Sequence, residues 1–153
     1  MMNDADFPLL TDWPACDYSV VGVIIQDDLK RAGVQLRDDF DHVSSPGLWT
    51  LFGGHVDPGE TIADTAPREL AEETGVIASI DDFEPFARLV PPDGLQAYHY
   101  YYRLKRPVAV PEISVHEGAG FAFIHYRQFK RYDFVNSARL ILEHLRTRNE
   151  FAL

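Results

Sequence analysis

The sequence contains little cysteine and few basic residues. Cys16 is the single cysteine in 153 residues, so no disulfide can form within the chain, and no C-x-x-C pair suggests a metal or redox site. Basic residues number 14 against 24 acidic residues, which gives a formal net charge of −10. Because binding to a phosphate backbone needs a surface of Lys and Arg, this balance predicts that nucleic acid is not a partner.

Long apolar runs and a basic N-terminal region are also missing. The sequence starts with MMNDADFPLL, which has acids where a signal peptide would have basic residues. No apolar run approaches the length of about 20 residues that a membrane-spanning helix needs. We therefore expect a cytoplasmic protein without membrane contact. Its length predicts a single domain over residues 1–153. Residues 1–16 are expected to be an N-terminal extension. The expected assembly is a monomer or a homodimer, between which the sequence does not decide.

Hydrophobic patterning predicts six strands and two longer helices. The strands are expected at residues 17–28, 34–39, 48–52, 83–90, 95–105 and 120–126. The turn sequence PPDG at residues 91–94 should join the fourth and fifth strands in an antiparallel hairpin. A helix is expected at 136–149, whereas the glycine-rich sequence GGHVDPGE at 53–60 is predicted to lack regular structure.

The first longer helix has signals at both ends. Thr61 is predicted to be its N-cap, with Asp64 as the capping-box partner, and Gly75 to follow its last turn. Pro67 lies inside it and removes one backbone donor. A kink or a restarted first turn is therefore expected there, with Thr65 or Ala66 as the alternative cap.

Three glutamates, Glu69, Glu72 and Glu73, fall within five positions of this helix. Spacings of three and four place their side chains on one face. At about 5 to 6 Å each pair would repel by roughly 3 kcal/mol if partly buried at an effective dielectric near 20. Arg68 can hold one carboxylate but cannot neutralise three. By composition alone, such a glutamate cluster is more commonly a solvated helix face. The residues around it, however, favour a cation site.

The surrounding residues resemble the Nudix box, G-x5-E-x7-R-E-U-x-E-E-x-G-U with U aliphatic, at every defined position. The matching residues are Gly54, Glu60, Arg68, Glu69, Leu70, Glu72, Glu73, Gly75 and Val76. The resemblance implies the α/β fold class of that family, a Nudix-type α/β/α sandwich with a mixed β-sheet. It also implies hydrolysis of a diphosphate linkage in a nucleoside diphosphate joined to another group, with Mg²⁺ or Mn²⁺ as cofactor.

The resemblance assigns roles to residues in and beside the box. Glu69, Glu72 and Glu73 correspond to metal ligands, Arg68 to the residue that orients a glutamate, and Glu60 to a supporting acid. The carbonyl of Gly53 corresponds to a backbone ligand in some members. Such a metal stabilises charge on the phosphoryl oxygens and activates a bound water for attack at phosphorus.

Further candidates come from similarity to the MutT-type branch of the family. Glu117, in HEGAGFAFI, is the candidate for a general base or additional ligand, with an exposed loop acid as its alternative and Glu112 as the fallback. Asn136 precedes the last helix, where an asparagine reads the base edge in MutT-type members. Asn is also a preferred N-cap, and capping is the favoured interpretation here.

Other substrate-binding candidates rest on residue chemistry. Arg37 can reach a phosphate or form a surface ion pair with Asp38 or Asp39. Phe121, together with Trp49 and Phe52, can stack on a base, although apolar aromatics in such a sheet more often belong to the core. His55 occupies a variable position of the box and receives no role.

The favoured substrate is a nucleoside triphosphate, cleaved to a nucleoside monophosphate and pyrophosphate. The glutamate loop and Asn136 both favour it by resemblance. ADP-ribose or a nucleotide sugar is the alternative, since Pro91 lies where ADP-ribose-cleaving relatives often carry a proline. A non-catalytic nucleotide sensor is the alternative from another functional class, although every box carboxylate is retained.

Overall fold

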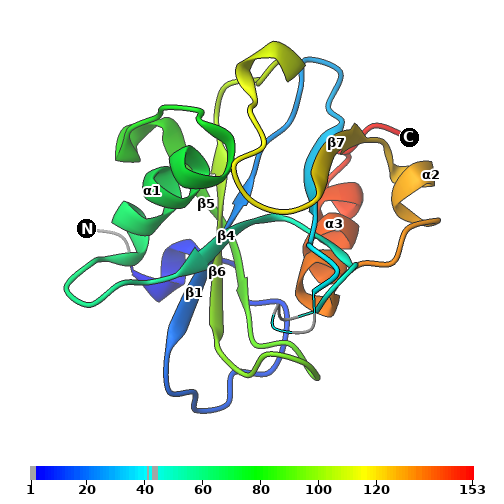
Figure 1. The fold of residues 1–153 in the computed structure, drawn as a ribbon. Coiled ribbons are helices and arrows are strands. Elements are labelled where there is room, and N and C mark those ends of the chain that lie inside the picture. The colour runs from blue at the N-terminus through cyan, green and yellow to red at the C-terminus, as the bar shows by residue number, and fades with distance from the viewer. Residues whose placement is uncertain (1–2, 41, 43–44) are drawn as a thin grey trace.

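The computed structural model describes residues 3–40, 42 and 45–153, which form two sheets and two long helices (Figure 1). The larger sheet has the strand order β4-β1-β6-β5, and the smaller one has the order β3-β2-β7. The strands are β1 Ser19–Ile24, β2 Ala32–Leu36, β3 Trp49–Thr50, β4 Phe52–His55, β5 Phe83–Leu89, β6 Tyr98–Leu104 and β7 Gly120–Ile124. The α-helices are α1 Ile62–Thr74, α2 Tyr126–Phe129 and α3 Asn136–Thr147, and short 3-10 turns lie at Asp4–Asp6, Ile80–Asp82 and Val110–Glu112.

The larger sheet is mixed, as predicted. β1 runs parallel to β6, whereas β4 pairs with β1 and β5 pairs with β6 in antiparallel fashion. The expected hairpin is therefore confirmed as β5 and β6. Within the described ranges, no helix is long and apolar enough to cross a membrane.

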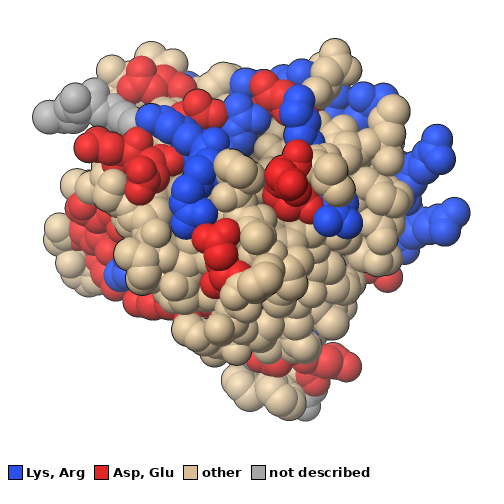
Figure 2. All heavy atoms as spheres, turned by 90° about the horizontal axis from the view of Figure 1, so that it is seen from above, with Lys and Arg blue, Asp and Glu red and all other residues tan. Residues whose placement is uncertain are grey.

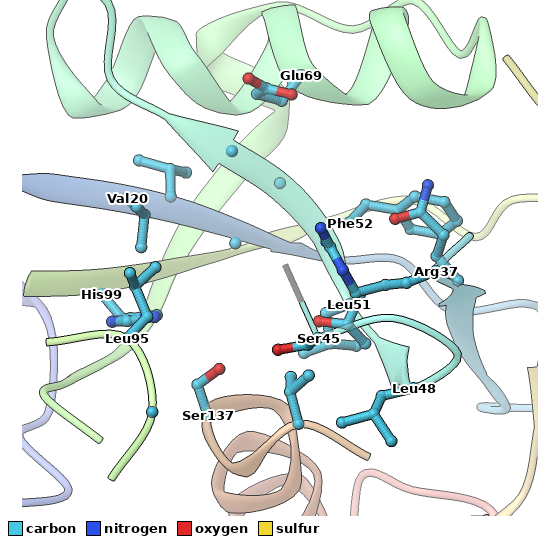
Figure 3. A pocket seen from close by; sticks show the side chains of 18 of the residues that line it. Val20, Arg37, Ser45, Leu48, Leu51, Phe52, Glu69, Leu95, His99 and Ser137 are labelled. Carbon is cyan, nitrogen blue, oxygen red and sulfur yellow. The ribbon is translucent and has the colours of Figure 1, made fainter. Parts of the chain in front are cut away.

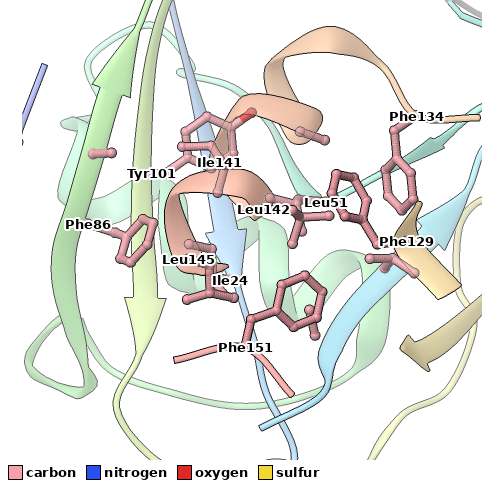
Figure 4. Close-up of a cluster of buried hydrophobic side chains, with 14 of the residues drawn as sticks. Ile24, Leu51, Phe86, Tyr101, Phe129, Phe134, Ile141, Leu142, Leu145 and Phe151 are labelled. Carbon is pink, nitrogen blue, oxygen red and sulfur yellow. The ribbon is translucent and has the colours of Figure 1, made fainter. Parts of the chain in front are cut away.

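Helices α1 and α3 cover opposite faces of the larger sheet. Val21 and Val23 of β1 belong to one buried cluster with Leu70 of α1. Ile24 of β1 belongs to a second cluster with Leu142 of α3, which Figure 4 shows between that helix and the strands. Since neighbouring strand residues point to opposite faces, the buried run in β1 serves both helices. The α/β/α arrangement is confirmed.

The prediction of irregular structure was wrong for the start of the glycine-rich segment. Strand β4 runs from Phe52 to His55 and pairs with β1 through Gly53 opposite Gly22 and Gly54 opposite Val21. Glycine disfavours strands in general, but pairing along an existing edge outweighs this preference. The two glycines let the edge strand approach both β1 and α1 closely.

Helix α1 begins where the sequence predicted and runs through Pro67 without interruption. Thr61 caps it through the expected capping box with Asp64, and Gly75 adopts a left-handed conformation after its last turn. The alternative caps Thr65 and Ala66 lie inside the helix and are fully buried. Packing of this buried face compensates for the donor that Pro67 lacks.

The described part of the N-terminal segment lies along β5. Phe7 is buried, and the backbone N–H of Arg88 donates to the carbonyl of Pro8 at 2.9 Å. The reciprocal bond joins the N–H of Leu10 to the carbonyl of Arg88 at 3.1 Å. This segment therefore covers an edge that would otherwise expose unpaired backbone groups.

Gly53 and Gly54 offer a matched pair of substitutions at the contact between β4, β1 and α1. A Cβ at Gly53 would lie 2.0 Å from the carbonyl oxygen of Val21, at a φ of +144°. A Cβ at Gly54 would meet only the flexible end of Glu69, 2.3 Å from Oε1. We expect Gly53→Ala to lower the free energy of unfolding by about 1–3 kcal/mol or more, and Gly54→Ala by less than about 1 kcal/mol. Urea denaturation of both variants measures this, and equal losses would contradict it.

Candidate active site

A cleft of about 840 Å³ passes beside β4 between helix α1 and the start of α3. Carboxylates line one end, from Glu69, Glu73 and Glu117. The start of α3 and residues of β6 line the other, and Figure 3 shows Glu69 across the cavity from His99 and Ser137. The cleft therefore joins an acidic end to an end of mixed polar and apolar character.

Glu73 is the most deeply buried acid of the cleft. Its side chain faces β4, and the residue is only 3% exposed. The backbone N–H of Gly53 donates to Glu73 Oε1 at 2.6 Å, and the Gln35 side chain also hydrogen-bonds this carboxylate. Burial outweighs these bonds and raises the pKa of Glu73 to about 8. A cation beside this group would stabilise the charge that the protein leaves poorly compensated.

Glu69 lies one helical turn before Glu73 on the same face of α1 and is also buried. Burial raises its pKa, whereas the guanidinium of Arg68 opposes the shift. Arg68 Nη1 donates to Glu69 Oε1 at 3.0 Å. The absent side chain of Gly54 makes room for this carboxylate. Glu69 and Glu73 thus form a buried acidic pair against the glycines of β4.

Arg68 connects the glycine-rich loop to the helix. Its Nε and Nη2 atoms donate to the two oxygens of Glu60 at 2.6 and 2.9 Å. Nη2 also donates to the carbonyl of His55 at 2.9 Å. Hydrogen bonding from Arg68 lowers the pKa of Glu60 to about 2, so this pair stays ionised at neutral pH. The roles that the resemblance implied for Arg68 and Glu60 in metal binding stay predictions.

Glu72 lies apart from the other two helix glutamates. Its side chain is 56% exposed and pairs with Arg68 Nη1 at 3.1 Å. Among the described residues that line the cleft, Glu69 and Glu73 are present and Glu72 is not. The spacing of four keeps Glu69 and Glu73 aligned on the sheet-facing side, while Glu72 turns toward the rim. The assignment of Glu72 as a metal ligand beside Glu69 and Glu73 stays a prediction.

Glu117 comes to the same end of the cleft from the loop before β7. Its negative charge contributes to the raised pKa of both Glu69 and Glu73. Gln35 Nε2 holds this loop by donating to the Glu117 carbonyl at 2.9 Å. The fallback candidate Glu112 is bound elsewhere, by the side chain of Arg106 at 3.0 Å. The structure thus brings Glu117, rather than Glu112, to the helix carboxylates.

The donor chemistry of this end suits a hard divalent cation. Glu69, Glu73 and Glu117 offer carboxylate oxygens, which Mg²⁺ and Mn²⁺ prefer, and the two helix carboxylates are buried. In the part of the chain that the structure describes, no group of three or more acidic, histidine or cysteine side chains is close enough together to hold a metal ion. Mg²⁺ typically completes its coordination with waters and substrate phosphates, so an open set of carboxylates fits it. Whether the Gly53 carbonyl takes part stays a prediction.

The predicted substrate-binding residues are placed differently from one another. Arg37 and Asn136 both line the cleft. Asn136 is the first residue of α3 rather than its cap, because Val135 holds the cap position, and its side-chain amide donates to Asp93. The favoured capping interpretation of Asn136 was therefore wrong. Phe121 packs against the cluster on the α1 side and is not among the described residues that line the cleft.

Sequence reasoning missed two polar residues of the cleft. Gln35 and His99 are both buried on strands, Gln35 on β2 and His99 on β6. Gln35 stands alone between apolar residues, and His99 interrupts a run of tyrosines. A polar residue within a buried strand needs a hydrogen-bond partner, and that was the available signal.

The face seen from above in Figure 2 carries acidic and basic side chains side by side rather than in blocks of one sign. The chain has 14 basic residues against 24 acidic ones. The expectation that nucleic acid is not a partner stays a prediction.

Comparison with known proteins identifies relatives along part of the chain. The chain is 36% identical over 66 residues to the NAD-capped RNA hydrolase NUDT12 of Macaca fascicularis, a match that covers 43% of this chain and 13% of the relative. It is 40% identical over 57 residues to the nucleoside triphosphatase NudI of Escherichia fergusonii, covering 37% and 39% respectively. The chain thus spans well under half the length of each of these relatives.

Solved structures share the fold over most of the chain. The MutT protein from Methanosarcina mazei Go1 has a TM-score of 0.66 at 16% identity, covering 94% of this chain and 97% of that protein. The NUDIX domain of Shewanella oneidensis NrtR, complexed with ADP ribose, has a TM-score of 0.71 at 16% identity, covering 88% and 89%. At these identities the likeness concerns the fold alone.

A family model described as NUDIX domain matches residues 18–145, a range that contains the whole box and both ends of the cleft. The buried acidic pair, the Arg68 bonds and the strand order all lie within that range. The predicted reaction class is that of the hydrolases in this family, which act on pyrophosphate bonds. The chain belongs to the NUDIX domain family.

Proposed function

We propose that the chain hydrolyses a nucleoside triphosphate to a nucleoside monophosphate and pyrophosphate, with Mg²⁺ or Mn²⁺ as cofactor. The observation that carries the proposal is the buried pair Glu69 and Glu73, joined by Glu117 at one end of a cleft of about 840 Å³. That volume lies in the range typical of small-molecule sites. Acids that repel one another beside such a cleft are suited to a cation and a phosphate chain.

Glu69, Glu73 and Glu117 would hold the metal, with Glu72 nearby at the rim. When bound, the metal supplies charge stabilisation at the phosphoryl oxygens and lowers the pKa of a water. Arg68 fixes Glu69 and the glycine-rich loop, and the N–H of Gly53 fixes Glu73. We assign the general base to Glu117, because it is exposed at the cleft and can accept a proton from the attacking water.

The other lining residues suit the remaining parts of a nucleotide. Arg37 can pair with a phosphate from the end of β2, and Asn136 with a polar edge of the base or sugar. The placement of Phe121 in the packed cluster supports its core interpretation over base stacking.

The relatives support a nucleotide substrate and differ over its class. NudI, named as a nucleoside triphosphatase, favours the triphosphate. The NrtR domain is described with ADP ribose, which keeps the ADP-ribose alternative in the test. NUDT12 is named as a hydrolase of NAD-capped RNA, and its match covers a small part of that protein.

A nucleotide screen tests the proposal directly. With Mg²⁺, the native protein should release pyrophosphate from at least one nucleoside triphosphate, and Glu73→Gln should lower kcat/KM by 100-fold or more, on the order expected for an essential metal ligand or charged group. Glu112→Gln is the matched control, since Glu112 lies outside the cleft lining and should leave the rate unchanged.

Several outcomes of the screen would contradict the proposal. Turnover in the presence of a chelator, or full activity of Glu73→Gln, would contradict metal-dependent hydrolysis at this site. Hydrolysis of ADP-ribose alone would keep that mechanism and replace the substrate. Nucleotide binding without any turnover would instead favour the sensor.

Arg68→Lys tests whether the two-pronged bond to Glu60 positions the site. Lysine keeps the charge but cannot donate to both Glu60 oxygens and the His55 carbonyl together. We expect kcat/KM to fall roughly 10–100-fold, as for other residues that orient metal ligands. Steady-state kinetics measure this, with Arg106→Lys, at the remote pair with Glu112, as control. Native kinetics in Arg68→Lys would show that charge alone suffices.

A further inference from the structure

His99 lies in the cleft at the end away from the carboxylates, and neither the box nor the metal site uses it. Its position on β6 is opposite Val20 of β1, and the residue is 6% exposed. Figure 3 shows it next to Leu95, with the cavity between them and Glu69. A buried imidazole at the wall of a cleft is a polar group whose hydrogen bonds must be accounted for.

One ring nitrogen of His99 has a fixed role. Nδ1 lies 2.9 Å from the carbonyl oxygen of Ala97. A carbonyl can only accept, so Nδ1 must carry the proton of this bond. In the neutral imidazole the other nitrogen, Nε2, is then an acceptor.

The Nε2 atom is available to a ligand. Among the residues that the structure describes, it has no hydrogen-bond partner. The hydroxyl of Tyr102 is the one buried side-chain nitrogen or oxygen atom in that part of the chain that is both inaccessible and unpaired. Since Nε2 is also unpaired, it must retain access to the cleft that His99 lines.

The surroundings keep His99 neutral. Burial lowers its pKa, and the nearby His55 lowers it further, while the bond to Ala97 opposes both. At neutral pH the ring therefore presents one acceptor and no positive charge to the cleft. Such a group binds an N–H or O–H donor and is not suited to a phosphate.

The surfaces next to His99 suit a flat ring rather than a phosphate chain. Val20 and Leu95 provide apolar side chains, and the Tyr101 ring lies nearly parallel to that of His99 at 6.4 Å. At the start of α3, Asn136 is held by Asp93 across this end of the cleft. If the phosphates occupy the carboxylate end, the base of the same nucleotide is directed here.

We propose that Nε2 of His99 selects nucleotides whose base carries an exocyclic amino group, by accepting a hydrogen bond from that group. The proposal rests on the proposed function for the direction of the nucleotide in the cleft. A base without the amino group leaves the acceptor desolvated and unpaired, which is the general origin of strong discrimination by polar sites.

Pairs of nucleoside monophosphates that differ only by deletion of the amino group test this in the metal-free protein at high ionic strength, which weakens the repulsion between the phosphate and the acidic end. The pairs are adenine with purine, guanine with hypoxanthine, and cytosine with 2-pyrimidinone. We expect native protein to bind the amino member of at least one pair about 10-fold or more tightly. His99→Phe keeps a ring but has no acceptor, so its affinities for the two members of a pair should differ by no more than about twofold. His99→Gln, which restores an acceptor oxygen, should recover part of it.

A second measurement does not depend on folding of any variant. The ¹⁵N resonance of His99 Nε2 in native protein should shift upfield when the preferred amino nucleotide binds, and remain in place with its deletion partner. For the affinity ratio, His144→Phe is the control, because His144 packs against Phe86 outside the described lining of the cleft and should leave the ratio unchanged.

Distinct outcomes separate this proposal from the proposed function. Equal affinities within all three pairs, no binding of any of them, or a ratio that persists in His99→Phe would overturn the role of His99. If 2′-deoxy nucleotides lose affinity while the amino pairs bind equally, the donor is the ribose and the base assignment is wrong. These measurements need neither metal nor turnover. If the protein shows the expected affinity ratio but hydrolyses no nucleotide, the proposed hydrolysis is contradicted and the proposed role of His99 in base selection stands.

Discussion

The close approach of an edge strand to helix α1 is the constraint on which the site depends. Gly53 and Gly54 have no side chains, so the carboxylates of Glu73 and Glu69 can fill the space against β4. Burial there raises the pKa of both acids, and Arg68 reaches only one of them directly. A cation and a charged ligand are the natural means of relieving this arrangement.

The cleft combines this acidic end with an end where His99 and Asn136 lie beside apolar side chains. The sheet makes the combination possible, because β4 and β6 both pair with β1 and so hold the two ends at fixed positions. Gln35 lies on β2 of the smaller sheet, and Glu117 lies in the loop before β7 of the same sheet. Both residues line the cleft, so residues of both sheets form its walls. In the proposed nucleotide site, the phosphate end and the base end would thus depend on different strands.

Local signals in the sequence predicted most of the fold and the central part of the site. The capping box at Thr61, the hairpin and the buried β1 depend on neighbours in the chain and were confirmed. The β4 strand depends on how distant segments pack, so local propensity misjudged it. His99 was missed because its acceptor role follows from the Ala97 carbonyl and the cleft, which no motif reveals.

The central claim is that Glu69 and Glu73 are buried together to bind a divalent cation. A crystal structure of the native protein soaked in Mn²⁺, with anomalous scattering to locate the ion, tests it most directly. The account predicts an Mn²⁺ ion coordinated by carboxylate oxygens of both residues, at the end of the cleft that Glu117 lines. Anomalous density elsewhere, or both carboxylates unchanged with no ion between them, would contradict it.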